Sequence, residues 1–356
     1  MRRCYSATIP TMNRADRRDE FCRQLWGWFK RHKRTLPWRD LKVKDQTQRA
    51  YMVLVSEVML QQTQVPRVEI IFRRFLREFP TIHDLAKATN REVILAWRGL
   101  GYNSRALRLR DAARLIMDSF LVVRPFLVSR SQAAERKTNN VQSKNVFPRT
   151  MKELTGIPGI GPYTAAAILN FAFNIPTPCL DTNIRRIIHR VFYGPERRDG
   201  TFEKKDHLLL ALASDLLLAS DSSAASSVSS ASSQWHAALM DFGSLVCTKR
   251  LPKCGSCPLG RNNLCRSTGR IKITRDVRKA KEPGREIAGK FVPNRIIRGR
   301  VVEYLRDRHG ASISDIGAHV CIDWDVEEHR EWLTGILVKL ARDGMIRSVR
   351  GTYTLT

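Results

Sequence analysis

The stretch LTGIPGIGPYTAAAIL, which runs from Leu154 to Leu169, decides the fold of this chain. Gly159 and Gly161 bracket a tight turn between two helical stretches, and the lack of a Cβ lets the backbone come close to a ligand. Backbone amides at the start of the second helix can then hold a phosphate oxygen. Structural turns of this composition are common, so the turn alone is weak evidence. It gains weight from the motif LDTN, residues 180–183, and from the helical pattern IRRIIHRVF that follows it.

Composition indicates a protein that binds a polyanion. The sequence has 356 residues, of which 43% are hydrophobic, so it can bury a proper core and is expected to form two folded units. Lys and Arg number 62 against 34 Asp and Glu, which leaves a net charge of +28. Such an imbalance repels itself unless a polyanion offsets it, and nucleic acid is the obvious one. The Trp and Phe content and the long amphipathic segments argue against the alternative, a ribosomal-type or membrane-surface protein.

Changes of pattern divide the chain. Apolar residues at three- and four-residue spacing predict helices from Glu20 to about Phe120. Two polar stretches, 121–145 and 220–233, are interpreted as surface insertions in a unit that extends from residue 20 to residue 266. Residues 1–19 are expected to form a basic tail, with an organellar transit peptide as the alternative.

A smaller unit is expected at residues 294–356, after a basic linker at residues 267–293. The apolar spacing predicts three helices there, at about Ile297–Leu305, Ser312–Val320 and Glu327–Asp343. The closing residues alternate as a hairpin around Arg350 and Gly351. Three helices and a hairpin predict a winged-helix-like module, which either binds DNA or serves only for packing.

The glycine turn, the aspartate and the helix after it together resemble the helix-hairpin-helix, Gly/Pro-Asp superfamily of DNA glycosylases. In that superfamily the hairpin grips the DNA backbone, and the aspartate, here Asp181, sits at the sugar whose bond is cut. Capping of the following helix is the alternative role of Asp181, and both roles can coexist. Lyase-competent members carry a lysine two residues past the second hairpin glycine, where this chain has Tyr163. Without an amine there, a Schiff base cannot form, so the resemblance implies a hydrolytic, monofunctional glycosylase.

A second segment, VLVSEVMLQQTQV at Val53–Val65, resembles the signature of adenine (MutY-type) glycosylases, together with the motif LPWR at residues 36–39. Glu57 stands among apolar neighbours, where an ionised carboxylate is expensive to bury. We therefore expect its pKa to be raised, so that it can act as a general acid. The alternative is a glutamate on the exposed stripe of an amphipathic helix.

The resemblance implies a mechanism with two carboxylates around a glycosidic bond and a cation-like sugar in the transition state. Glu57 would protonate N7 of adenine and help position water. An ionised Asp181 would stabilise the developing oxocarbenium ion or briefly bond to it. Tyr163 and Asn183 would support the two acids.

A target base inside a duplex must be flipped out and the gap filled. By resemblance, Gln62 is the intercalating glutamine, and Tyr102 is the aromatic that slips beside the damaged guanine. The family usually has a second aromatic after that tyrosine, where this chain has Asn103. Trp38 and Arg39 would line the adenine pocket, although Trp38 could instead be a core residue.

Four of the eight cysteines crowd between residues 247 and 265, which is typical of metal ligation rather than of disulfides. Cys247, Cys254, Cys257 and Cys265 have the spacing C-x6-C-x2-C-x7-C and could bind zinc or a 4Fe-4S cluster. The resemblance implies the 4Fe-4S cluster, although the last interval is two residues longer than in the family. Four basic residues would make this loop a surface for phosphates, namely Lys249, Arg250, Lys253 and Arg261.

The expected fold is mainly α, a six-helix barrel with an iron-sulfur helical domain, followed by the small winged-helix-like module. The resemblance covers about Glu20–Arg266 and implies excision of adenine mispaired with 8-oxoguanine or guanine in base excision repair. The alternatives are a thymine mismatch or endonuclease III-like glycosylase, and a DNA-binding protein that keeps the fold without catalysis. Many adenine glycosylases end in a Nudix-like domain that recognises 8-oxoguanine, and the segment after Pro293 does not resemble one.

The expected partner is double-stranded DNA that contains mispaired adenine, bound by a monomer. No apolar run reaches the roughly 18 residues of a membrane span, so no membrane is expected as a partner. The expected location is the nucleus or mitochondrion of a eukaryote, or the nucleoid or cytoplasm of a prokaryote.

Overall fold

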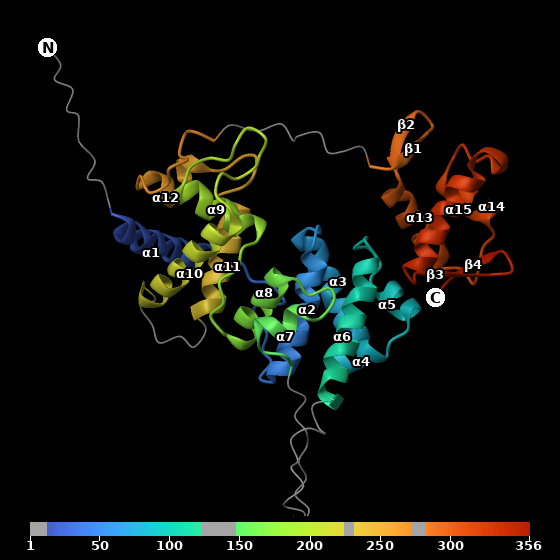
Figure 1. The fold of residues 1–356 in the computed structure, drawn as a ribbon, viewed down its shortest axis with the longest axis horizontal. Coiled ribbons are helices and arrows are strands. Elements are labelled where there is room, and N and C mark those ends of the chain that lie inside the picture. Colours follow the sequence, from blue (N-terminus) through green and yellow to red (C-terminus); the bar gives the residue numbers. More distant parts are fainter. Residues whose placement is uncertain (1–12, 123–146, 224–230, 272–281) are drawn as a thin grey trace, which may run out of the picture. The chain divides into compact units, whose positions relative to one another are not determined.

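The computed structural model describes residues 13–122, 147–223, 231–271 and 282–356 (Figure 1). Helices dominate these ranges, and the strands in them form two short hairpins, which confirms the predicted mainly-α fold. The chain folds into two compact units. Of the described residues, the first unit comprises 13–35, 169–223 and 231–271, and the second comprises 36–122, 147–168 and 282–356.

The first unit packs around an aromatic core. Its elements are α1 (Arg14–His32), the end of α8 (Pro162–Phe173), α9 (Thr182–Phe192), α10 (Asp206–Ser223), α11 (Ala231–Leu245), the 3-10 turn η1 (Cys254–Ser256) and α12 (Pro258–Arg261). Phe21 of α1 meets Phe192 of α9 and Trp235 of α11 edge-on, with ring centroids 5.5 and 6.0 Å apart. Buried aromatic side chains contribute much of a core's stability, so this cluster fixes α9 against α1 and α11.

The second unit is built around α2. Its helices before the C-terminal segment are α2 (Gln46–Leu60), α3 (Val65–Glu78), α4 (Ile82–Lys87), α5 (Asn90–Ala96), α6 (Ser104–Val122), α7 (Met151–Thr155) and the start of α8. Every residue of α2 from Val53 to Met59 is buried. A helix that is covered on all sides lies in the interior of its unit, and this position carries Glu57 inside.

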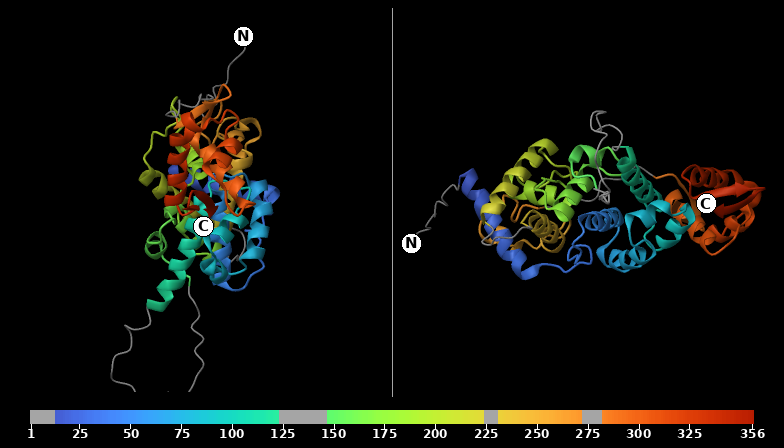
Figure 2. Two further views of the ribbon diagram at one scale, coloured as in Figure 1. Left: turned by 90° about the vertical axis from the view of Figure 1, so that its right-hand side faces the viewer. Right: turned by 90° about the horizontal axis from the view of Figure 1, so that it is seen from below.

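The C-terminal module (residues 284–356) also belongs to the second unit. It contains β1 (Gly284–Ile287), β2 (Lys290–Pro293), α13 (Asn294–Arg306), α14 (Ile313–Val320), α15 (Val326–Arg342), β3 (Ile346–Val349) and β4 (Thr352–Leu355), drawn in orange and red in Figures 1 and 2. Strands β3 and β4 pair antiparallel, and Ala311 forms a bridge to Tyr353 at their edge. The predicted three helices and closing hairpin are confirmed, and with them the winged-helix-like arrangement.

The structure corrects several predicted boundaries. Helix α1 begins inside the predicted tail 1–19, because the Asn13 side chain caps it by accepting a hydrogen bond of 2.9 Å from the Asp16 amide. The end of the predicted linker 267–293 forms the β1–β2 hairpin, whose turn residues Ala288 and Gly289 both have positive φ. This turn type usually carries Asn-Gly or Asp-Gly, so Ala-Gly gave no signal. The predicted single unit 20–266 is divided between the two compact units.

The predicted loop 220–233 was also partly wrong, since α10 continues to Ser223 and α11 begins at Ala231. Two of its serines are buried. The Ser220 hydroxyl donates to the Leu217 carbonyl of its own helix at 2.6 Å, and the Ser232 hydroxyl donates to the Asn170 side chain. A serine that satisfies its hydroxyl in this way can pack in a helix. The rest of this stretch, 224–230, and nearly all of the predicted insertion 121–145 lie outside the described residues.

Candidate active site and nucleic-acid interface

Asp181 caps the N-terminus of α9. One carboxylate oxygen accepts a hydrogen bond of 2.6 Å from the Ile184 amide, and the other accepts one of 2.9 Å from the Asn183 side-chain amide. Burial is the strongest influence on this carboxyl and raises its pKa above the ordinary value, against the opposing effect of these hydrogen bonds. The positive end of the helix holds the carboxylate in place, and a cation formed beside it would stabilise the charge further.

Two residues that sequence analysis missed hold Asn183 in position. The buried Arg186 donates to the Asn183 side-chain oxygen at 2.7 Å, to the Gly243 carbonyl at 2.8 Å and to the Cys247 carbonyl at 2.7 Å. A Cβ added at Gly243 would lie 2.6 Å from Cβ of Asn183, so only glycine fits where α11 passes α9. The available signal was an arginine on the isoleucine-rich face of α9, where a charge needs a partner.

Glu57 lies in the interior of the second unit. Its exposed fraction is 7%, and its neighbours Val55, Ser56 and Val58 in α2 are buried as well. This burial excludes the alternative of a glutamate on an exposed helical stripe. Glu57 belongs to the second unit, whereas Asp181 and Asn183 belong to the first.

The glycine hairpin joins α7 to α8 as predicted. Gly159 has a φ of +94°, a conformation that favours glycine, and it lies against Arg108 of α6. Gly161 is exposed, and a Cβ there would meet nothing within 4 Å, which leaves room for a ligand close to the backbone. Ile160 between them is buried and anchors the turn. Tyr163 is half-buried in the first turn of α8, which begins at Pro162.

The two residues predicted to enter the duplex have strained backbones. Gln62 has a φ of +55° and Tyr102 a φ of +46°, a region that residues other than glycine seldom adopt. Both side chains are exposed, and the exposed fraction of Tyr102 is 48%. Backbone strain of this kind persists only where the surrounding structure enforces it, and it is concentrated at functional sites. The sequence contains no signal for these two conformations.

Arg105 of α6 enforces both conformations from inside the protein. It donates to the Val58 and Met59 carbonyls at 3.0 and 3.1 Å and to the Gln61 carbonyl, at the end of α2. It also donates to the Leu100 and Gly101 carbonyls at 3.3 and 3.1 Å, just before Tyr102. One buried cation thus joins the Gln62 turn (residues 61–64) to the Tyr102 turn (residues 97–103).

The hairpin belongs to the same corner of the second unit. Gln61, Arg105, Arg108 and Gly159 line one small hollow with residues of α2 and α6. The exposed Arg108 places a cation beside the hairpin. The second unit therefore brings together the hairpin, both strained turns and a positive charge, which are the parts that a DNA backbone and a distorted duplex require.

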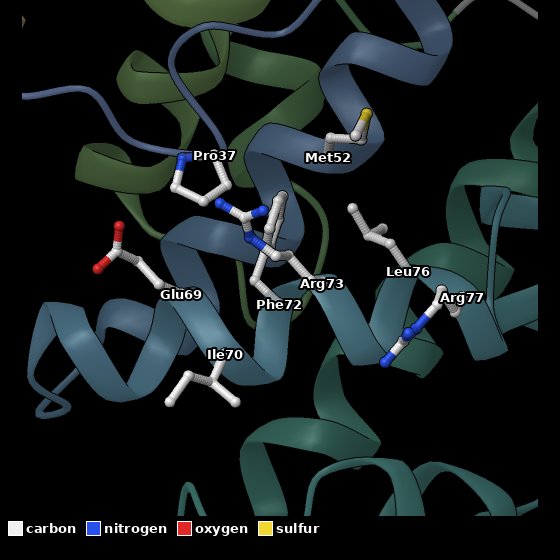
Figure 3. Close-up of a pocket in the computed structure, with 8 residues that line it drawn as sticks. All are labelled: Pro37, Met52, Glu69, Ile70, Phe72, Arg73, Leu76 and Arg77. Atoms are coloured by element: carbon white, nitrogen blue, oxygen red, sulfur yellow. The ribbon is translucent and has the colours of Figure 1, made fainter.

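Trp38 is a core residue rather than an open pocket wall. Its exposed fraction is 6%, and its ring meets Phe72 of α3 edge-on at 5.6 Å. A hollow on the face of α2 and α3 lies next to it and is lined by Pro37, Met52, Glu69, Ile70, Phe72, Arg73, Leu76 and Arg77 (Figure 3). Among these described lining residues there is no predicted site residue. Arg39 is partly exposed in the turn after Leu36.

The four clustered cysteines follow α11 and surround η1 and α12. Arg190 of α9 is almost fully buried beside them and donates to the Cys247 sulfur at 3.6 Å and to the Thr248 carbonyl at 2.7 Å. Burial raises the pKa of Cys257 to about 11 and also raises those of Cys254 and Cys265, and neighbouring cysteines add to the effect. Among the described residues, no three His, Cys, Asp or Glu side chains are grouped closely enough to share one metal ion.

Comparisons with known proteins agree with this arrangement. Residues 55–208 match the family model of the HhH-GPD superfamily of base excision DNA repair proteins, the class that the hairpin and Asp181 define. The adenine DNA glycosylase of Mycolicibacterium smegmatis is 34% identical over 284 residues, which cover 80% of this chain and 80% of that relative. The adenine DNA glycosylase of Rattus norvegicus is 35% identical over 255 residues, which cover 70% of this chain and 42% of that relative. This chain belongs to the adenine DNA glycosylase family.

Solved structures share the fold. A thermostable thymine-DNA glycosylase has a TM-score of 0.53 at 24% identity, over 70% of this chain and 96% of that one. A non-covalent endonuclease III–DNA complex has a TM-score of 0.51 at 18% identity, over 72% of this chain and 98% of that one. Within the ranges that the structure describes, no helix combines the length and the apolar character needed to cross a membrane.

Proposed function

We propose that this chain removes adenine mispaired with guanine or 8-oxoguanine from duplex DNA, by hydrolysis and without cutting the strand. Membership of the adenine DNA glycosylase family makes it a DNA N-glycosylase that acts on adenine in base excision repair. The proposal adds the base opposite adenine, the hydrolytic chemistry and the residues that carry it out. It would act as a monomer where cellular DNA lies, in a nucleus or mitochondrion or in a prokaryotic nucleoid.

The observation that carries the proposal is the burial of Glu57 inside the adenine-glycosylase signature. Adenine is a poor leaving group as an anion, so the bond between C1′ and N9 breaks more easily once a proton reaches N7. Glu57 supplies that proton, and the base leaves as neutral adenine. Water then adds to C1′ and gives its proton to the Glu57 carboxylate, which restores the acid.

Asp181 acts on the sugar in this proposal. The sugar gains positive charge as the bond to adenine breaks, and a carboxylate beside it stabilises that charge. The raised pKa of Asp181 supports this role, because an anion that is poorly solvated before the reaction gains most from a neighbouring cation. Asn183 holds the carboxylate through its 2.9 Å hydrogen bond, and Arg186 holds Asn183.

Tyr163 supports the monofunctional assignment. A lyase needs an amine at this hairpin position to form a Schiff base with the sugar, and a phenol cannot supply one. The product is therefore an abasic site in an intact strand.

The strained turns account for base extrusion. Gln62 and Tyr102 are exposed side chains on backbones that Arg105 keeps rigid, which suits wedges that fill the space left by the flipped base. The hairpin and Arg108 hold the neighbouring phosphates. Trp38 and Arg39 shape the adenine pocket, Trp38 from within the core.

A 4Fe-4S cluster held by Cys247, Cys254, Cys257 and Cys265 completes the proposal. The donor set consists of four thiols, and the buried Arg190, which also pairs with Glu196 at 2.8 Å, donates to the Cys247 sulfur. A bound cluster would tie the loop together beside exposed Lys249, Arg250, Lys253 and Arg261 and present them to phosphates.

The test is a panel of duplexes incubated with purified protein. Adenine opposite guanine or 8-oxoguanine should be released, and the strand should break only after alkali. Borohydride should trap no protein–DNA adduct. Release of thymine or of oxidised pyrimidines in place of adenine, or strand breakage without alkali, would refute the proposal.

A further inference from the structure

The C-terminal module shares its core with the helices on either side of the Tyr102 turn. Ile94 of α5 and Leu107 of α6 belong to the same buried cluster as Ile297, Val301 and Leu305 of α13. Burial of this apolar surface favours the packed arrangement. The module therefore packs against the two helices that flank the Tyr102 turn.

Arg306 connects this core to the turn itself. It is 4% exposed, and its guanidinium donates to the Asn103 side-chain oxygen at 3.0 Å and to the Ile94 carbonyl at 3.1 Å. It also pairs with Glu303 of its own helix. A second arginine of the module, Arg295, reaches the Tyr102 hydroxyl at 3.5 Å.

Asn103 accepts the Arg306 hydrogen bond through its side-chain oxygen. An aromatic side chain cannot accept the Arg306 hydrogen bond as the Asn103 amide oxygen does. Asn103 is 8% exposed and directly follows Tyr102, whose φ is positive. A hydrogen bond at Asn103 thus restrains the residue next to the strained one.

The acidic start of α15 argues against direct reading of DNA by the third helix of the module. In a winged-helix domain this helix would enter the major groove. Here α15 begins with Glu327, Glu328 and Glu331, all exposed, and their charge repels phosphates.

We propose that the C-terminal module is a positioning domain, in which Arg306 holds the Tyr102 turn through Asn103 in the conformation that meets the base opposite adenine. The inference rests on the proposed function, because Tyr102 must be a wedge for its position to matter. Arg306 and Asn103 are positioning residues. They act on DNA only through Tyr102.

The test is a double-mutant cycle on the full-length protein. Dissociation constants are measured at fixed salt for a duplex with adenine opposite 8-oxoguanine, blocked against cleavage by a 2′-fluoro sugar, and for a fully paired duplex. The Arg306→Met variant loses the hydrogen bond from a charged donor to Asn103. Its affinity for the mispair duplex should fall about tenfold, and its affinity for paired DNA should be unchanged. In a Tyr102→Ala background, Arg306→Met should cause no further loss. Arg306→Lys should restore part of the affinity.

Two further variants keep the test decisive. Arg298→Met is the matched control, since Arg298 lies on the same helix α13 and pairs with Asp343 inside the module, with no bond to the Tyr102 turn among the described residues. It should leave mispair binding unchanged. Asn103→Ala removes the same hydrogen bond from the other side and replaces Arg306→Met if that variant melts before the assay temperature.

The outcomes separate the inference from the proposed function. An undiminished further loss in the Tyr102→Ala background, or an equal loss from Arg298→Met, would overturn the inference alone. The inference alone would also be overturned if Tyr102→Ala lost mispair affinity while Arg306→Met and Asn103→Ala lost none. No loss from Tyr102→Ala would overturn both the wedge role of Tyr102 and the inference. Absence of adenine release by the wild type would overturn the proposed function itself.

Discussion

Replacing Arg105 by methionine should destabilise the second unit and relax both strained turns. Arg105 is 5% exposed, and three of its hydrogen bonds, to the carbonyls of Val58, Met59 and Leu100, are fully buried. Each orphaned carbonyl costs roughly 2 kcal/mol, which gives about 6 kcal/mol for the three. Burial lowers the pKa of Arg105 to about 10, so removal of the cation returns about 3 kcal/mol. A net loss of about 3 kcal/mol is expected.

The pH dependence of this prediction follows from the same pKa. A base with a lowered pKa in the folded protein costs stability wherever it is charged in both states, which holds below about pH 10. That cost is relieved only as the pH rises above about 10. The stability difference between the wild type and Arg105→Met should therefore be constant between about pH 6 and pH 9.

Urea unfolding of both proteins at neutral pH measures the difference, and mispair binding reports the state of the turns. Arg108→Met is the control for stability, because Arg108 is exposed on the same helix and its side chain bonds to Ser104 one turn earlier. It should change the free energy of unfolding by less than about 0.5 kcal/mol. An Arg105→Met protein as stable as the Arg108→Met protein would refute the reasoning.

Four further results are expected. The adenine-release rate should fall at acid pH with a midpoint above 3.8, since Asp181 must be ionised and burial raises its pKa, and a midpoint at or below 3.8 would exclude this role. The raised pKa also means that ionised Asp181 costs stability, so the stability of the wild type relative to Asp181→Asn should fall as the pH rises through that midpoint. Gly243→Ala should cost about 1–3 kcal/mol and slow adenine release, because its Cβ would lie 2.6 Å from Cβ of Asn183, whereas Gly335→Ala, with nothing within 4 Å, should stabilise or leave the free energy unchanged. The purified protein should show a thiolate-to-iron absorbance band that is lost when Cys257 is replaced by Ser, and a colourless, active preparation loaded with zinc would contradict the cluster assignment.

The helical fold was predictable because its signals are local. The glycine turn, the apolar spacing of the helices and the closing hairpin each follow from a few neighbouring residues, and all three were confirmed. The errors came where tertiary contacts override local preference. Buried Ser220 and Ser232 satisfy their hydroxyls inside the fold, so a serine-rich stretch that reads as a loop is helical at both ends.

The sequence motifs named the candidate site residues but not the residues that hold them in position. Motifs pointed to Glu57, Asp181 and the cysteines, the side chains to which the proposed function assigns the chemistry. Motifs gave no sign of Arg105 or Arg186, whose importance lies in bonds to the carbonyls of residues distant in the sequence. A charged residue on the buried face of a predicted helix is the general signal that would have found both.

The central claim is that buried Glu57 gives its proton to the departing adenine. The most direct measurement compares Glu57→Gln with the wild type on one duplex with adenine opposite 8-oxoguanine, by binding and by single-turnover release of the base. Glutamine keeps the shape but has no acidic proton, so affinity should stay within about threefold while the rate falls roughly 10²–10⁴-fold. Release within about threefold of the wild-type rate would show that Glu57 is not the acid and would contradict the proposed mechanism.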